Sequence, residues 1–139
     1  MTQTNLSELR SAITAGKTSC AQEVKSCIDL AHKKSDLNIF IEVFEDSAIA
    51  KAIEVDEKLI NGSAGKLAGM IIAIKDNLCY SGHKVSASSK MLKDFESQFN
   101  STVVQKLLDA DAIIIGRTGG DEFAMGSSSE TSFYGPVKN

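Results

Sequence analysis

Residues 65–77 read GKLAGMIIAIKDN, and this stretch decides the fold class. Its centre, residues 70–74, is a short apolar run without the alternation of a half-exposed strand. Such a run is typical of a strand that helices cover on both faces, as in a parallel sheet. Lys75, Asp76 and Asn77 follow directly, at the carboxyl end of the predicted strand. Open α/β sheets bind their ligands at that edge, so we expect any chemistry of this chain there.

A second buried strand is predicted at residues 112–116, which read AIIIG. Between the two strands, Ser101 has the side chain of a helix N-cap and precedes an apolar helical face. The order strand, helix, strand is that of a crossover unit, in which the two strands run parallel in one sheet. The sequence GRTGG at residues 116–120 predicts a turn. Two strands leave open sheet edges, so we expect helices packed on a mixed or parallel central sheet that this chain cannot complete.

The first 62 residues predict a mainly helical region. Asn5 is a helix N-cap followed at the third position by Glu8, the arrangement of a capping box. Ser19 and Gln22 repeat this arrangement at the start of a second helix. Each pair marks where a helix begins, and the helix from Ser19 carries an apolar stripe that faces the core.

A third helix is predicted over residues 46–60. Its apolar face comprises Ile49, Ile53 and Ile60. Residues 39–46 read as a short strand or an extended connection. We therefore expect residues 1–139 to form the N-terminal part of a single domain, mainly helical up to residue 62 and α/β from residue 63.

Composition and charge exclude several functional classes. The chain of 139 residues has 18 acidic and 15 basic side chains, and its net charge of −3 argues against electrostatically driven binding of nucleic acid. Its longest apolar run is too short to cross a bilayer, and no secretory signal begins the chain. The three cysteines are expected to be reduced thiols. These features predict a cytoplasmic protein without a membrane segment.

Lys75 is the most interesting candidate for chemistry. A lysine that ends a buried strand either reaches solvent or is held inside by partners, and its spacing alone favours solvent. An uncharged lysine amine is a general base, and burial favours the uncharged form. The neighbouring Asp76 and Asn77 either cap a turn or orient the amine.

For the other residues with reactive side chains, the sequence favours a structural role over a catalytic one. The serines at residues 127–129 lie in MGSSSE, where a nucleophile would need a base and an oxyanion hole, while a tight turn needs only small residues. Cys79 and His83 are four positions apart in a loop, which does not bring a thiol and an imidazole together. Cys20 and Cys27 share a helical face and predict core packing. Two distant histidines do not make a zinc site.

Several of these segments together resemble the amidase signature family. They are GKLAGMIIAIKDN at 65–77 and DEFAMGSSSETS at 121–132. The latter, with GPVKN at 135–139, is similar to one branch of that family, the A subunits of amidotransferases acting on glutamyl-tRNA(Gln) or aspartyl-tRNA(Asn). The resemblance implies the N-terminal portion of the amidase signature fold. Relatives more often have an amide or polar residue where this chain has Gly119 and Gly120, which leaves the geometry of that loop open.

The resemblance also implies a catalytic mechanism. In this family a lysine, a serine beside a cis peptide bond and a nucleophilic serine hydrolyse an amide. Only Lys75 matches one of these three positions, both serines being expected after Asn139, so the chain by itself is expected to be inactive. Met125, Gly126 and Ser127 are implied as contacts of the substrate glutamine rather than as catalysts.

Partners follow from the same resemblance. The A subunit would release ammonia from glutamine, while a B subunit uses ATP and Mg²⁺ to activate the misacylated tRNA, which it mainly binds. A small C subunit would clasp the A subunit. No cofactor is expected in this chain itself. Two alternatives stay open, an amidase signature hydrolase of another small amide and a non-catalytic module whose N-terminal helices bind a partner.

Overall fold

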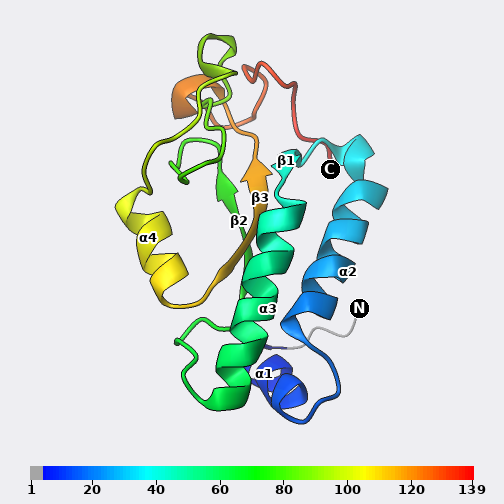
Figure 1. The fold of residues 1–139 in the computed structure, drawn as a ribbon. Coiled ribbons are helices and arrows are strands. Elements are labelled where there is room, and N and C mark those ends of the chain that lie inside the picture. Colours follow the sequence, from blue (N-terminus) through cyan, green and yellow to red (C-terminus); the bar gives the residue numbers. More distant parts are fainter. Residues whose placement is uncertain (1–4) are drawn as a thin grey trace.

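The computed structural model describes residues 5–139, in which helices lie on both faces of a small sheet (Figure 1). The helices are α1 (Leu6–Thr14), α2 (Cys20–Lys33), α3 (Glu45–Asn61) and α4 (Thr102–Asp109). The strands are β1 (Phe40–Val43), β2 (Ile71–Lys75) and β3 (Ile113–Thr118), in the order β1-β3-β2. β3 pairs antiparallel with β1 and parallel with β2. The predicted α/β class and the mixed sheet are confirmed.

The core is divided between the two faces of the sheet. Helices α1, α2 and α3 pack on one face, against Ile113 and Ile115 of β3. On the other face, Val104 of α4 packs against Ile74 and Ile114. Helix α4 lies between β2 and β3 in the chain, so these parallel strands form the predicted crossover unit. In residues 5–139, no helix combines the length and apolar character that a membrane span requires.

Both predicted capping boxes form N-caps. The side-chain oxygen of Asn5 accepts a hydrogen bond from the backbone N–H of Glu8 at 2.9 Å, directly before α1. Ser19 Oγ accepts the N–H of Gln22 at 3.1 Å, directly before α2. Each cap satisfies a donor that the first helical turn leaves free, so the two helices begin where the sequence predicts.

In α3 the buried face differs from the predicted one. Ile53 and Ile60 are exposed, whereas Ala48, Ala52 and Val55 are completely buried. These short side chains pack in the same core cluster as α2 and β3. Close packing of backbones favours the face with the smallest side chains, which outweighs the greater hydrophobicity of isoleucine. Ile49 lies partly buried at the margin of this face.

The prediction that residues 70–74 form a strand covered on both faces is also wrong. The run at residues 70–74 is an edge strand, β2, with Ala73 exposed, and the central strand is β3. β3 is buried from Ile113 through Arg117 because β1 and β2 pair with its two sides. The predicted turn at residues 116–120 is wrong at its start, because β3 continues to Thr118.

A buried carboxylate fixes the loop that leads into β2. Asp111, which lies between α4 and β3, accepts the backbone N–H of Gly65 at 2.7 Å. Its other oxygen binds the ammonium groups of Lys51 and Lys58, both from α3, at 3.2 and 2.7 Å. A side chain at Gly65 would overlap the backbone of Ala110, so the two loops are in direct contact. This contact sets where β2 begins alongside β3.

The predicted core cysteines are confirmed. Cys20 is 1% exposed, and Cys27 packs partly buried against the same cluster. Burial, together with the hydrogen bond and charge of Asp56, raises the pKa of the Cys20 thiol to about 12. Burial also raises the pKa of Cys27. Both side chains are therefore uncharged and serve as core filling.

Candidate active site

The carboxyl ends of β2 and β3 lie side by side at one end of the sheet (Figure 1). Lys75, the last residue of β2, pairs with Thr118, the last residue of β3. After Thr118 the chain passes through Gly119 and Gly120 into the serine-rich loop. Lys75, these residues and the loop line an open depression of about 420 Å³. Sites for small molecules have volumes of this order, and this one lies where the sequence predicts chemistry.

Lys75 enters this depression with its side chain exposed to solvent. A Cβ atom on Gly120 would lie 2.7 Å from Lys75 Cε, so the lysine side chain packs directly over the Gly120 backbone. No partner within residues 5–139 forms a hydrogen bond or an ion pair with Nζ. Of the two positions left open for the Lys75 side chain, the structure shows the one that reaches solvent, because the depression is open and is lined mainly by small residues.

The serine-rich loop is ordered by one carboxylate. Asp121 accepts the backbone N–H groups of Ser128 and Ser129 at 3.1 and 2.9 Å and the hydroxyl of Thr131 at 3.0 Å. The bond from the Ser129 N–H is the main reason that the pKa of Asp121 lies below its usual value. A Cβ on Gly126 would overlap the Asp121 carboxyl group. The loop therefore folds around a charged carboxylate at the wall of the depression.

The three predicted substrate contacts fall into two groups. Gly126 and Ser127 line the same depression as Lys75. Met125 does not line it, and its side chain is 81% exposed. The preceding short helical turn contains Phe123 and Ala124 with positive φ, which changes the chain direction just before Met125.

Asp76 forms a buried cluster that the sequence did not reveal. Asp76 is the first residue after β2 and does not line the depression that Lys75 enters. Its carboxylate is almost completely buried and accepts the backbone N–H groups of Ser86 and Ser88 at 3.0 and 2.8 Å. The Ser86 hydroxyl and the Arg117 guanidinium also donate to it. Of the two roles predicted for Asp76, the first, holding a turn, is the one that the contacts show.

Arg117 carries the opposite charge of this cluster. It lies in β3, 5% exposed, between Asp76 and Glu42, whose carboxylate accepts from Arg117 Nε at 2.9 Å. Burial opposes the positive charge, but the hydrogen bonds and charges of the two carboxylates outweigh it and raise the pKa of Arg117. The Tyr134 ring lies 5.8 Å from the guanidinium, and its hydroxyl donates to Ser86 Oγ at 3.0 Å. The sequence feature that could have pointed to this arginine is its position directly after the apolar run IIIG at residues 113–116.

Other candidate residues do not form a reactive group. His83 stacks on Tyr80 and Phe44, with ring centroids 4.3 and 4.0 Å apart, and its burial lowers its pKa. No hydrogen bond joins it to Cys79 in the described part of the chain. Within residues 5–139, no group of three or more His, Cys, Asp or Glu side chains is arranged to hold a metal ion. A second hollow, between α2 and β1, is mainly apolar and is lined by none of the predicted site residues.

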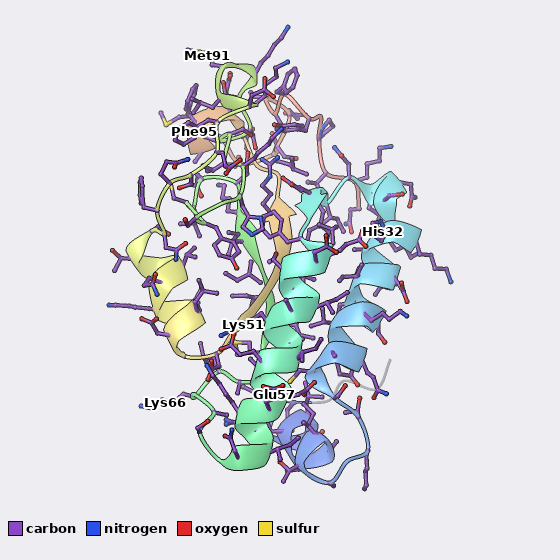
Figure 2. The ribbon with its side chains drawn as sticks, viewed as in Figure 1. His32, Lys51, Glu57, Lys66, Met91 and Phe95 are labelled. Atoms are coloured by element: carbon purple, nitrogen blue, oxygen red, sulfur yellow. The ribbon has the colours of Figure 1, made fainter. Side chains whose placement is uncertain are left out.

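Apolar side chains are exposed at the end of the molecule that carries the depression. Met91 and Phe95, in the long loop between β2 and α4, project there (Figure 2). Met91 is 83% exposed and Phe95 47%, and Phe123 is 48% exposed. Met125 is 81% exposed, and these four exposed apolar side chains are called the apolar rim below.

Comparison with known proteins identifies the family. The amidase family profile matches residues 22–139. The chain belongs to the amidase signature family. Two curated amidase relatives are the glutamyl-tRNA(Gln) amidotransferase A subunits of Salinibacter ruber and Chlorobaculum tepidum, which are 45% and 46% identical over 133 residues. Each match covers 95% of this chain, and the chain spans only 26% and 28% of the two relatives.

The amidase fold is also found among solved structures. The X-ray structure of native peptide amidase from Stenotrophomonas maltophilia superposes with a TM-score of 0.87 and 25% sequence identity. That match covers 99% of this chain and 30% of the peptide amidase chain. The three-stranded sheet and its helices are therefore a part of the amidase fold, with Lys75 at one end of the sheet.

Proposed function

We propose that this chain supplies the general base, Lys75, to the glutamine-hydrolysing site of a tRNA-dependent amidotransferase A subunit. One observation carries the proposal. Lys75 ends β2 beside the Asp121-ordered serine loop, in a chain that is 41–46% identical to such A subunits. Gly126 and Ser127 line the same depression and are proposed to contact the glutamine.

The proposed chemistry begins with the uncharged Lys75 amine. It takes a proton from one serine hydroxyl, which in turn deprotonates a second serine. The second serine oxygen attacks the side-chain amide carbon of glutamine, and backbone N–H groups stabilise the oxyanion. Ammonia leaves with the proton returned from the lysine, and water then hydrolyses the glutamyl ester to release glutamate. Both serines are proposed to lie outside these 139 residues, so the chain alone is expected to be inactive.

The released ammonia is proposed to serve tRNA modification. A B subunit would bind the misacylated tRNA, activate its glutamyl or aspartyl group with ATP and Mg²⁺, and receive the ammonia. A C subunit would clasp the A subunit in a cytoplasmic heterotrimer. The names of the curated relatives support this assignment, since those proteins are the A subunits of glutamyl-tRNA(Gln) amidotransferases.

A second candidate function is hydrolysis of another small amide without tRNA. It is favoured by the close superposition of this chain on a peptide amidase. The sequence identity to that enzyme is 25%, far below the identity to the amidotransferase subunits. Co-purification separates the two candidates, because the subunit would be isolated together with B and C subunits and a lone amidase would not.

Replacement of the lysine tests the proposed base. In the complete subunit, Lys75→Met is expected to lower the rate of glutamine hydrolysis about 10²–10⁴-fold, the range that general-base catalysis provides. Its thermal midpoint should change little because the Lys75 side chain is exposed. Ammonia release and thermal unfolding are the two measurements.

The matched control is Lys66→Met. Lys66 is an exposed lysine near the opposite end of the molecule (Figure 2), and its replacement should leave both measurements unchanged. If Lys75→Met hydrolyses glutamine at the rate of the unmodified subunit, Lys75 is not the base and the proposal is wrong.

A further inference from the structure

We propose that Asp76 is a positioning residue for Lys75, acting through Ser88 and Gly120. This role rests on the proposed function of Lys75 as a base. It assigns a task to the buried carboxylate that the amide chemistry itself does not use. The two residues are neighbours in sequence, but of the two only Lys75 lines the depression, so the coupling between them runs through the surrounding loops.

The first link joins Asp76 to the turn at residues 86–88. The Asp76 carboxylate accepts the backbone N–H of Ser88 at 2.8 Å, and the Asp76 carbonyl accepts the N–H of Ala87 at 2.8 Å. Ala87 and Ser88 have φ values of 48° and 55°, a backbone region that residues other than glycine rarely adopt. The turn therefore depends on the hydrogen bonds that Asp76 accepts.

The second link joins this turn to the wall of the depression. Ser88 Oγ accepts the backbone N–H of Gly120 at 3.1 Å. Ser88 is 2% exposed, so water does not readily replace this bond. The position of the Gly120 backbone is thus set by the Ser88 hydroxyl, whose own position is set by Asp76.

The third link joins the wall to the amine. The Lys75 side chain packs over Gly120, whose Cα leaves no room for a methyl group beneath Lys75 Cε. Asp76 also holds the backbone beneath the lysine, since its N–H donates to the Thr118 carbonyl at 3.0 Å. The backbone that carries the lysine side chain and the Gly120 surface along which this side chain extends are therefore both fixed through Asp76.

Arg117 forms an ion pair with the Asp76 carboxylate. Its guanidinium donates to Asp76 from the neighbouring strand, and a second carboxylate, Glu42, holds the other side of the guanidinium. The guanidinium and the N–H groups of the turn thus bind the same almost fully buried carboxylate, and hydrogen bonds in such an ion pair are strong. Displacement of a reacting group by about 1 Å is enough to lower a rate about 10²-fold, so fixing of this kind matters for a base.

The test compares three variants of the complete subunit. Ser88→Ala removes only the acceptor for the Gly120 N–H, Asp76→Asn weakens the whole turn, and Asp94→Asn replaces an exposed carboxylate as the control. Two measurements are made: the kinetics of glutamine hydrolysis, which give kcat and KM, and the hydrogen-exchange rate of the Gly120 amide.

We expect kcat to fall about 10-fold in Ser88→Ala and about 10²-fold in Asp76→Asn, with KM within about twofold of the original. The Gly120 amide should exchange at least about tenfold faster in both variants, since it loses its partner. Asp94→Asn should change neither quantity. A general loss of structure would instead lower the amount of folded protein and leave kcat per folded molecule unchanged.

Two results would overturn the inference. One is an unchanged kcat in Ser88→Ala when Gly120 exchange is accelerated, and the other is unchanged Gly120 exchange. Ser88→Ala decides the matter if Asp76→Asn does not fold. The proposed function is tested separately: it is wrong if the Lys75→Met subunit is active. If Lys75→Met is inactive but Ser88→Ala is fully active, only the positioning role is rejected.

Discussion

Two carboxylates, Asp76 and Asp121, hold the loops on either side of the candidate site. Each accepts two backbone N–H groups from serines close together in the sequence. A hydrogen bond to a charged acceptor is roughly twice as strong as one between neutral groups. Short serine-rich loops that lack apolar side chains are thereby given a definite conformation. The serines that the sequence offers as nucleophile candidates are, in part, donors that order the site.

The lowered pKa of Asp121 predicts a pH dependence of its loop. Its folded pKa lies below the ordinary value of 3.8, chiefly because the Ser129 N–H donates to the charged form. The stabilisation is therefore fully present above about pH 4 and is lost as the pH falls through the folded pKa. Protection of the Ser128 and Ser129 amides from hydrogen exchange, relative to the intrinsic rate at each pH, should be lost over that acidic range.

The control for this prediction is Asp121→Asn. An asparagine carries no charge to lose, so its loop should already be weakly protected at neutral pH and should lose no further protection on acidification. Equal exchange in the original protein and the variant at neutral pH would contradict the role given to Asp121.

Of the residues at and beside the depression, the sequence predicted some and missed others, for clear reasons. Lys75, Gly126 and Ser127 were found because a strand end and a family motif mark them, and the structure brings them to one depression. Arg117 was missed because its glycine-rich surroundings are typical of a turn. Its partner Asp76 lies 41 positions away, and a contact at that separation leaves no local pattern.

At the scale of elements, α3 shows how packing selects a helix face. The helix buries Ala48, Ala52 and Val55 and leaves Ile53 and Ile60 in solvent. Its ends were predictable from local signals, within one residue on either side. Its orientation was not, because that depends on how closely α2 and β3 approach, which no property of the helix itself determines.

Substitutions on the two faces of α3 test this orientation. Ala52→Leu inserts a branched side chain into a fully buried position, and overpacking of this kind costs about 1–3 kcal/mol of unfolding free energy. Ile53→Ser removes a side chain that is 49% exposed and should change the unfolding free energy by less than about 0.5–1 kcal/mol. Urea denaturation of the two variants measures both values. A greater loss in Ile53→Ser than in Ala52→Leu would show that the isoleucine face is buried.

At the scale of the whole molecule, the sheet of residues 5–139 has one unpaired edge on β1 and one on β2. The sequence predicted this from two apolar runs that cannot close a sheet. The sequence predicted a central strand at residues 70–74, which is wrong: β3 is central because β1 pairs with its other side, and that pairing of residues far apart in the chain leaves no local pattern. Unpaired strand edges are templates for further strands, and the apolar rim lies at the same end as the site.

The exposed edges predict self-association of the 139-residue chain. Its sedimentation coefficient should rise with concentration over a micromolar range, because strand edges and apolar side chains pair between molecules. A charged substitution on the rim, Met91→Glu, should reduce the association without lowering stability, since Met91 is 83% exposed. A chain that sediments as a monomer at all concentrations would contradict this expectation.

The register between β2 and β3 has one more consequence. Lys75 pairs with Thr118 after an irregularity in the ladder between Ile72 and Ile74. If the two strands slipped by a single residue, every side chain of β2 would turn to the opposite face. The Asp76 carboxylate would then occupy the place of the Lys75 amine, and the amine would lie among the buried serines. A register error of one residue would therefore be enough to disrupt the site. Mutations at this irregularity are thus expected to inactivate the protein without unfolding it.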